Sequence, residues 1–259
     1  MQLERAFLVL TPYESRRVIA KAVSQLTDVQ EALKNGWIIV ATGSTNGYVA
    51  EELLGSPIVK ENFISGHITQ GETWNTPGNP DFIFPIVLYK GVRQDMRAEQ
   101  ALEQFGPGDV FIKGANAVDH QGHAAVFMAH QAGGTIGSAL GTLYARGAKL
   151  IIPVGLEKMI PSVTEAVKHS GNRSYAHTTG SPVGMMPIVN AIVVTEIQAL
   201  TDLFAVQAYH IGSGGIAGSE GAVSLVLEGG REAVKKAFDF IQTIKGEKPL
   251  QRPNGVPKQ

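Results

Sequence analysis

Short apolar runs recur along the chain up to about residue 155, and each is separated from the next by a more polar segment. Runs this short and this rich in β-branched residues are typical of buried strands. They predict strands at residues 7–10, 37–41, 82–88, 110–112 and 149–154. Pro85 interrupts the third run, which favours an edge strand there because proline cannot donate to a β-ladder.

The segments between these runs carry apolar residues at helical spacing. Thr11, Pro12 and Glu14 form a capping-box pattern, so a helix is expected to begin there and to end before Asn35 and Gly36. Further helices are expected at residues 48–54, 96–105 and 135–146. This alternation predicts an α/β fold over residues 1–182, with a Rossmann-like, mostly parallel sheet flanked by helices.

The pattern changes after residue 170. Residues 171–187 are rich in glycine, proline and polar side chains, which predicts an exposed linker or a binding loop. The order strand, helix, strand, glycine-rich hairpin, strand, helix then predicts a small α+β, ferredoxin-like subdomain within residues 183–259. The last residues, from 248 onward, are polar and rich in proline, and we expect them to be frayed.

Composition limits the classes of function. The 259 residues carry a net charge of −1 and include no cysteine, which excludes disulfides and thiol nucleophiles. The near-neutral charge gives no reason to expect a nucleic-acid partner. No apolar stretch approaches the roughly 20 residues of a membrane span, and the N-terminus lacks a signal-peptide pattern. We therefore expect a cytoplasmic protein without a membrane partner, cofactor or metal.

A polar, glycine-containing segment connects the second predicted strand to a helix. Its residues are Gly43, Ser44, Thr45, Asn46 and Gly47. A strand that ends in such residues and restarts as a helix presents free backbone N–H groups and a positive dipole end, which suits a phosphate or carboxylate. A plain strand-to-helix turn with a capping side chain is the alternative.

A second group of polar residues follows the fourth predicted strand. Lys113 and Asn116 come directly after residues 110–112, and Gly133, Gly134 and Thr135 open the next helix. Because ligands of open α/β sheets bind at the carboxyl ends of parallel strands, these residues are expected to face the same ligand as the first segment. An exposed lysine paired with a surface acid is the alternative interpretation of Lys113.

The two segments together resemble a superfamily that includes ribose-5-phosphate isomerase A, glucosamine-6-phosphate deaminase and the coenzyme A transferases. Residues 41–45 resemble its strand-to-G-T-G-S-T junction, residues 113–117 its D-G-A-D-E segment, and residues 157–158 its later S-K pair. The resemblance implies an isomerase-like scaffold with a small α+β unit in its second half.

The departures from that pattern concern the catalytic acids. Lys113 and Asn116 stand where the isomerase has two carboxylates, and neither can transfer a proton as a carboxylate does. Ribose-5-phosphate isomerase activity is therefore not expected. A catalytic carboxylate or imidazole must come from elsewhere if the protein is an enzyme.

Three other segments offer candidate side chains. Residues 119–123 contain Asp119 and His123, which predict either an acid–base or metal site or a simple polar turn. The segment with His67 and Glu72 is a loop or a short hairpin that could supply the carboxylate. Residues 177–181 are rich in donors and could close over a ligand. The glycine-rich hairpin at 212–218 is expected to be flexible or to form a contact of a homo-oligomer.

These observations predict a protein that binds a small anionic metabolite, such as a sugar phosphate or an acyl-coenzyme A. If it is an enzyme, isomerisation or hydrolysis is the leading class, with Lys113 stabilising negative charge and Glu72, Asp119 or His123 transferring protons. The alternative is a non-catalytic binding, regulatory or assembly protein that retains the anion site without the acids.

Overall fold

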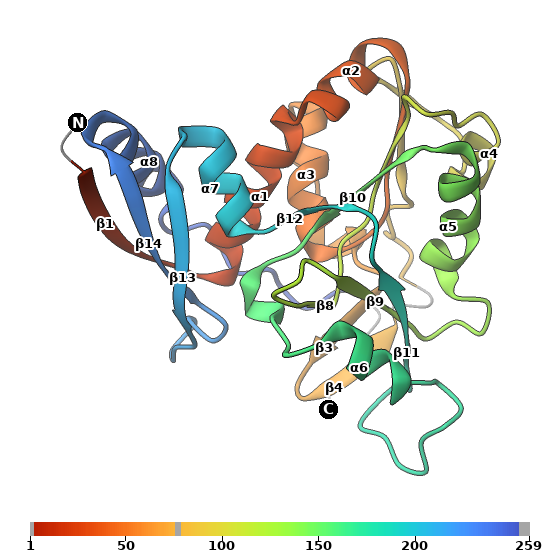
Figure 1. The fold of residues 1–259 in the computed structure, drawn as a ribbon. Helices are drawn as coiled ribbons and strands as arrows, with labels where there is room; N and C mark the ends of the chain where they lie inside the picture. The colour runs from red at the N-terminus through yellow and green to blue at the C-terminus, as the bar shows by residue number, and fades with distance from the viewer. Residues whose placement is uncertain (1–2, 76–78, 254–259) are drawn as a thin grey trace.

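The chain forms a mixed α/β structure whose largest sheet has six strands (Figure 1). It is described here from a computed structural model that covers residues 3–75 and 79–253. In spatial order the strands are β12 (Ile192–Val194), β10 (Lys149–Pro153), β7 (Val110–Ile112), β2 (Trp37–Val40), β5 (Ile86–Tyr89) and β6 (Val92–Gln94). The first four are parallel to one another, β5 pairs antiparallel with β2, and β6 pairs antiparallel with β5 at the edge of the sheet.

Helices cover both faces of this sheet. They are α1 (Pro12–Gln25), α2 (Thr27–Asn35), α3 (Ser44–Leu54), α4 (Ala98–Leu102) and α5 (Gly134–Arg146). Alternate residues of a strand point to opposite faces, so Ile38 and Val40 join a core with α1 and α3 while Ile39 joins one with α4 and α5. Within the described ranges, no helix combines the length and apolar character needed to cross a membrane.

The predicted start of the first helix is confirmed, and its predicted length is wrong. The Thr11 hydroxyl accepts a hydrogen bond from the Glu14 backbone N–H, and the Glu14 carboxylate accepts one from the Thr11 N–H. This is a capping box. Leu26 then adopts an extended backbone conformation (φ −58°, ψ 138°), which divides the expected single helix into α1 and α2.

A separate three-stranded sheet lies beside the main body (Figure 1). Its order is β1 (Leu3–Leu10), β14 (Val223–Gly230) and β13 (Gln207–Ser213), all antiparallel, with α7 (Glu196–Phe204) and α8 (Arg231–Ile244) nearby. The sequence pattern predicted that the tail alone builds this sheet, and this prediction is wrong. Residues 192–194 join the main sheet, and the N-terminal strand β1 pairs with β14 at the edge of the small sheet.

Two smaller β elements complete the structure. One is a sheet of order β11 (Gly184–Ile188), β9 (Ala124–Met128) and β8 (Ala117–Val118), which the sequence analysis did not anticipate. The other is a hairpin of β3 (Gly66–Thr69) and β4 (Glu72–Asn75), so the hairpin alternative for this segment is confirmed. Residues 76–78 of the same segment lie outside the described residues.

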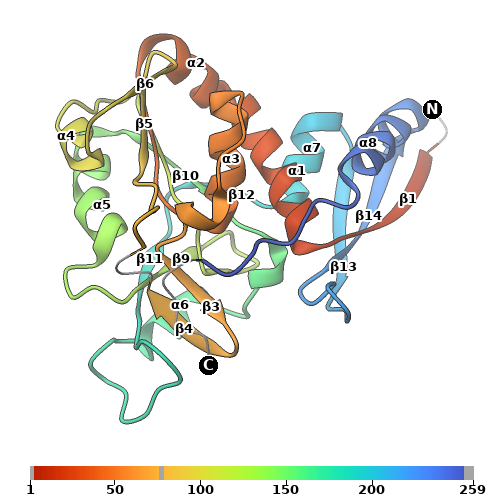
Figure 2. The same cartoon turned by 180° about the vertical axis from the view of Figure 1, so that it is seen from behind.

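Two local expectations are corrected. β5 is not an edge strand, because it lies between β2 and β6, and Pro85 precedes it without entering the ladder. The described part of the tail after residue 248 is not frayed, since the Gln251 N–H donates to the Glu61 carboxylate at 2.9 Å. Figure 2 shows this segment leaving α8 and crossing past α3 toward the β3–β4 hairpin. Residues 254–259 lie outside the described part.

Candidate functional site

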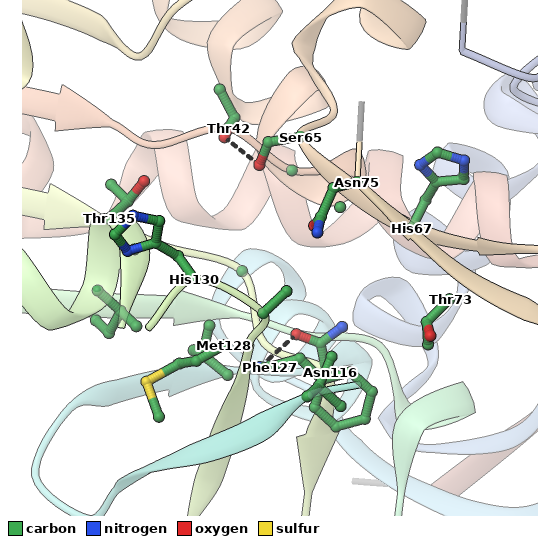
Figure 3. Close-up of a pocket in the computed structure, with 18 of the residues that line it drawn as sticks. Thr42, Ser65, His67, Thr73, Asn75, Asn116, Phe127, Met128, His130 and Thr135 are labelled. Carbon is green, nitrogen blue, oxygen red and sulfur yellow. Dashed lines mark hydrogen bonds between the residues drawn. The ribbon is translucent and has the colours of Figure 1, made fainter. Parts of the chain in front are cut away.

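A cavity of about 1000 Å³ opens where β2 and β7 end. Its wall combines the segments after both strands with the start of α5, the β3–β4 hairpin, β9 and Lys158. Figure 3 shows the labelled side chains around an open space, with Thr42 and Ser65 on one side and Asn116 and Phe127 on the other. This is the edge of an open α/β sheet at which ligands are expected.

Two helices begin at the cavity wall without a side-chain cap. Gly43 precedes α3 and Gly133 precedes α5, and neither helix start has a side-chain hydrogen bond to its first N–H groups. The first residues of both helices line the cavity. Uncapped N–H groups and the positive ends of two helix dipoles therefore meet at one space, which favours an anion.

The expected anion-binding residues fall largely along this wall. Seven of the nine line the cavity, namely Gly43, Ser44, Thr45, Asn116, Gly133, Gly134 and Thr135. Gly133 has a φ of +81°, and a side chain there would meet Gly137 at 2.9 Å, so the start of α5 requires glycine. The sequence thus located part of the cavity wall at both junctions.

Asn46 and Gly47 occupy positions behind the wall. The Asn46 amide donates to the carbonyl oxygens of Ala41 at 2.6 Å and Ile112 at 3.2 Å, which joins the ends of β2 and β7. A side chain at Gly47 would lie 3.1 Å from the Lys60 side chain. Both residues position the site and do not contact the cavity.

Two lysine side chains line the cavity. Among the described residues, the Lys113 ammonium makes only long contacts, with the carbonyl oxygens of Gly114 at 3.4 Å and Thr42 at 3.5 Å. The Lys158 ammonium donates to the Ala115 carbonyl at 2.9 Å. Neither forms a salt bridge with any residue of the described ranges. The two cations are thus held by carbonyl dipoles and not by carboxylates.

Burial lowers the pKa of both lysines to about 8, because removing an ammonium from water disfavours its charged form. The neighbouring charge of Lys158 lowers the pKa of Lys113 further. Glu157 and Glu196 act on Lys158 in the opposite direction, and Arg16 lowers its pKa. An anion placed between the lysines would relieve the unfavourable charge of both.

No Asp or Glu is found among the described residues of the cavity wall, and its other ionisable groups are two histidines. The His130 Nδ1 accepts a hydrogen bond from the Ala132 N–H at 3.1 Å, so the proton of the neutral ring lies on Nε2. Burial, with a smaller effect of Arg252, lowers the pKa of His67. This lower pKa favours the neutral ring of His67, and a neutral imidazole can accept a proton.

Asp119 and His123 lie outside this wall and form a structural turn. The Asp119 carboxylate accepts from the backbone N–H groups of Gln121 and His123, each at 3.0 Å, and from that of Val163 at 2.9 Å. Burial raises the pKa of Asp119, but these donors outweigh it and the net pKa is lowered. The polar-turn interpretation accounts for these contacts. The structure also groups no three His, Asp or Glu side chains for a metal ion within the described residues.

Glu72 also lies outside the cavity wall, although its neighbours Thr73, Trp74 and Asn75 line it. Glu72 begins β4 and pairs with Thr69 across the hairpin. Glu72 thus stands at the turn end of the hairpin, next to Gly71, whereas the rest of β4 lines the cavity.

The donor-rich segment at 177–181 does reach the site. The Thr73 hydroxyl donates to the Ser181 carbonyl at 2.5 Å, and the Ser181 N–H donates to the Thr73 carbonyl at 2.8 Å. Ser181 lines the cavity. The β3–β4 hairpin and this segment therefore close one side of the site together.

Lys158 was indicated by the sequence only through the resemblance of residues 157–158, and its place in the site depends on the turn after β10. The buried Glu196 carboxylate accepts from the Leu156 N–H at 2.9 Å and so fixes this turn.

Comparisons with protein-family models, with curated proteins and with solved structures find no match for this chain.

Proposed function

We propose that this protein binds a small anionic metabolite, of the sugar-phosphate or acyl-coenzyme A type, in the cavity at the ends of β2 and β7. The observation that carries the proposal is the charge of the wall. Two lysines without a carboxylate partner and two uncapped helix starts face a space whose described lining includes no acid. Such a wall favours an anion over a neutral ligand.

The proposed reaction class is isomerisation or hydrolysis of that ligand. Lys113 stabilises developing negative charge, as cations in a partly dry site do efficiently. The proton-transfer role suggested for Glu72, Asp119 or His123 passes to the cavity histidines, because His67 and His130 line the space and those three do not. The Rossmann-like sheet, the ferredoxin-like small sheet and the isomerase-like scaffold belong to the same proposal.

The second candidate is a binding or regulatory protein without catalysis. The observation that favours it is the acid-free described lining, since proton transfer between carbons is commonly carried out by a carboxylate. Turnover assays on every ligand that binds separate the two candidates.

The experiment is a thermal-shift screen with sugar phosphates, acyl-coenzyme A compounds and their uncharged analogues, followed by calorimetry. A ligand at 100 times its Kd stabilises the folded state by about 2.7 kcal/mol, which is a visible shift in Tm. Lys113→Met and Lys158→Met should each weaken binding at least tenfold, whereas Lys236→Met, at an exposed position of α8, should not change it. Equal binding by charged and uncharged analogues would refute the anion site.

A further inference from the structure

We propose that Lys113 is a nucleophilic amine that condenses with a carbonyl group of the ligand, so that the site takes phosphorylated aldehydes or ketones. This inference rests on the proposed anion site, because the anionic group must be anchored at the helix starts for the carbonyl to reach Lys113. It assigns Lys113 a covalent role beyond charge stabilisation.

The first argument is that Lys113 differs from two other lysines of the chain, which have carboxylate partners. Lys60 lies 2.8 Å from the Glu51 carboxylate and Lys245 lies 2.9 Å from that of Glu14. Within the part of the chain that the structure describes, Lys113 has only carbonyl contacts of 3.4 and 3.5 Å. A salt bridge holds an amine in its charged form, whereas Lys113 has nothing of this kind to prevent loss of its proton.

The second argument is the position of the amine. The Lys113 N–H donates to the Ile151 carbonyl at 3.0 Å, which fixes the backbone at the end of β7 beside β10. The side chain lines the same cavity as the first residues of α3 and α5, and its ammonium lies 3.5 Å from the Thr42 carbonyl oxygen, two residues before α3. A ligand anchored at either start presents its other end to this amine, as proximity catalysis requires.

The charge of the second lysine, Lys158, also favours Lys113 as the nucleophile. Lys158 donates a good hydrogen bond to Ala115, and Glu157 and Glu196 favour its charged form. The Lys113 ammonium has only the longer contacts of 3.4 and 3.5 Å among the described residues and lies close enough to Lys158 for that charge to lower its pKa, so its contacts hold the proton less well than those of Lys158 do. With a pKa of about 8, about a tenth of Lys113 is neutral at pH 7, roughly 200-fold more than for an ordinary lysine. An amine desolvated beside another cation is a known form of activated nucleophile.

The chemistry balances without an oxidant or reductant. The neutral Lys113 Nζ gives its lone pair to the carbonyl carbon, and the carbonyl oxygen takes a proton from the Lys158 ammonium to form a carbinolamine. The neutral Lys158 amine takes one proton from the Nζ cation and delivers it to the hydroxyl group, which leaves as water as the C=N bond forms. Lys158 then takes the remaining Nζ proton, which gives the neutral imine and restores the Lys158 ammonium. The net change is one amine and one carbonyl to one imine and one water.

The test traps the imine. The full-length protein is mixed at pH 7.5 with dihydroxyacetone phosphate or glyceraldehyde 3-phosphate, reduced with borohydride and mapped by mass spectrometry of its peptides. We expect the reduced adduct on Lys113 at a level at least tenfold above that on the exposed Lys236. Lys113→Arg keeps the positive charge but is not nucleophilic, so it should lose the adduct while still binding glycerol 3-phosphate.

The outcomes separate the two proposals. Stabilisation by glycerol 3-phosphate with adducts only on surface lysines would overturn the imine and leave the anion site standing. Absence of both stabilisation and a Lys113 adduct would overturn the anion site and the imine together. An adduct that persists in Lys113→Arg would place the nucleophile elsewhere and overturn the assignment.

The pH profile gives an independent readout. The ionisable groups that face the pair are His67 and His130 across the cavity, with Glu157, Glu196 and Arg16 behind Lys158. The initial trapping rate at Lys113 should rise with pH up to about 8 and then level off. The rate at exposed lysines should keep rising above pH 9. A Lys113 profile that matches the exposed lysines would contradict its activation.

Discussion

At the scale of single residues, the two lysines of the cavity wall lower the stability of the folded state. Lys113 and Lys158 bring two positive charges into a partly buried space, and their pKa values fall to about 8. The unfolded chain, in which a lysine has a pKa near 10.4, therefore binds more protons than the folded chain between about pH 8 and 10.5. Stability should rise with pH across that window.

Lys113→Met tests this cost. The substitution removes a charge that the fold disfavours, so at pH 7 the free energy of unfolding should increase by about 1–2 kcal/mol, with water in the cavity reducing the full effect. Urea denaturation at pH 7 and at pH 10 measures it, and the gain should shrink at pH 10. Lys236→Met is the matched control and should change stability by less than about 0.5 kcal/mol. A destabilised Lys113→Met would show that the amine stabilises the fold.

The sequence could place Lys113 but not Lys158. Lys113 directly follows an apolar run, and the end of a parallel strand is a position that the pattern itself defines. Lys158 reaches the cavity because a buried carboxylate from α7, forty residues away, fixes the preceding turn. The predicted acid–base role of Asp119 came from a cluster of polar residues in the sequence. In the structure its carboxylate instead accepts hydrogen bonds from the backbone of one turn and of α6 (Val163–Lys168).

At the scale of elements, one side of the cavity is formed where the β3–β4 hairpin pairs with residues 179–181. Thr73 and Gly180 form a β-bridge, and a side chain at Gly180 would overlap the Thr73 backbone. Gly180 also has a φ of +85°, which disfavours any other residue. The contact thus requires glycine on two grounds.

Gly180→Ala should displace the hairpin. We expect a loss of about 1–3 kcal/mol in the free energy of unfolding, together with faster hydrogen exchange at the Ser181 amide that bonds to Thr73. Gly122→Ala is a matched control, because Gly122 has a φ of +81° but open space around it. If both variants lost the same stability, only the backbone conformation would matter and the contact with Thr73 would be unimportant.

Elements defined by local signals were predictable, and those defined by distant pairing were not. The capping box at Thr11 and the glycine stops at Gly36 and Gly147 lie within a few residues of the helices that they bound. β8 has two residues, and its sheet forms only because β9 pairs with β11, almost sixty residues further on. Nothing in a short window of sequence specifies such a partner.

At the scale of the whole molecule, the two ends of the chain fold together. β1 pairs along its full length with β14, so the small sheet needs both the first ten residues and the tail. Leu8 and Leu10 face the buried side and Leu3 is 63% exposed. The sequence pattern assigned the small unit to the tail because nothing local shows that the first strand returns to it. The expected homo-oligomer remains a prediction.

Leu10→Ala tests whether β1 stabilises the small sheet. Removing a fully buried leucine should cost about 2–5 kcal/mol, and hydrogen exchange should increase along β14 and β13 as well as in β1. Leu3→Ala, at the exposed end of the same strand, should cost less than about 0.5 kcal/mol. Exchange that increases only within the first ten residues would show that β1 is not an integral part of the sheet.

The central claim is that two lysines and two helix starts form one anion site, and its most direct test is calorimetric titration with glycerol 3-phosphate at pH 7 and pH 9.5. Both lysines lose their charge as the pH rises through about 8, while the phosphate, with a second pKa of about 6, keeps its negative charge. The account predicts that the affinity falls at least tenfold between the two pH values, and that Lys113→Met already binds weakly at pH 7. Affinity that is equal at both pH values, or unchanged in Lys113→Met, would contradict it.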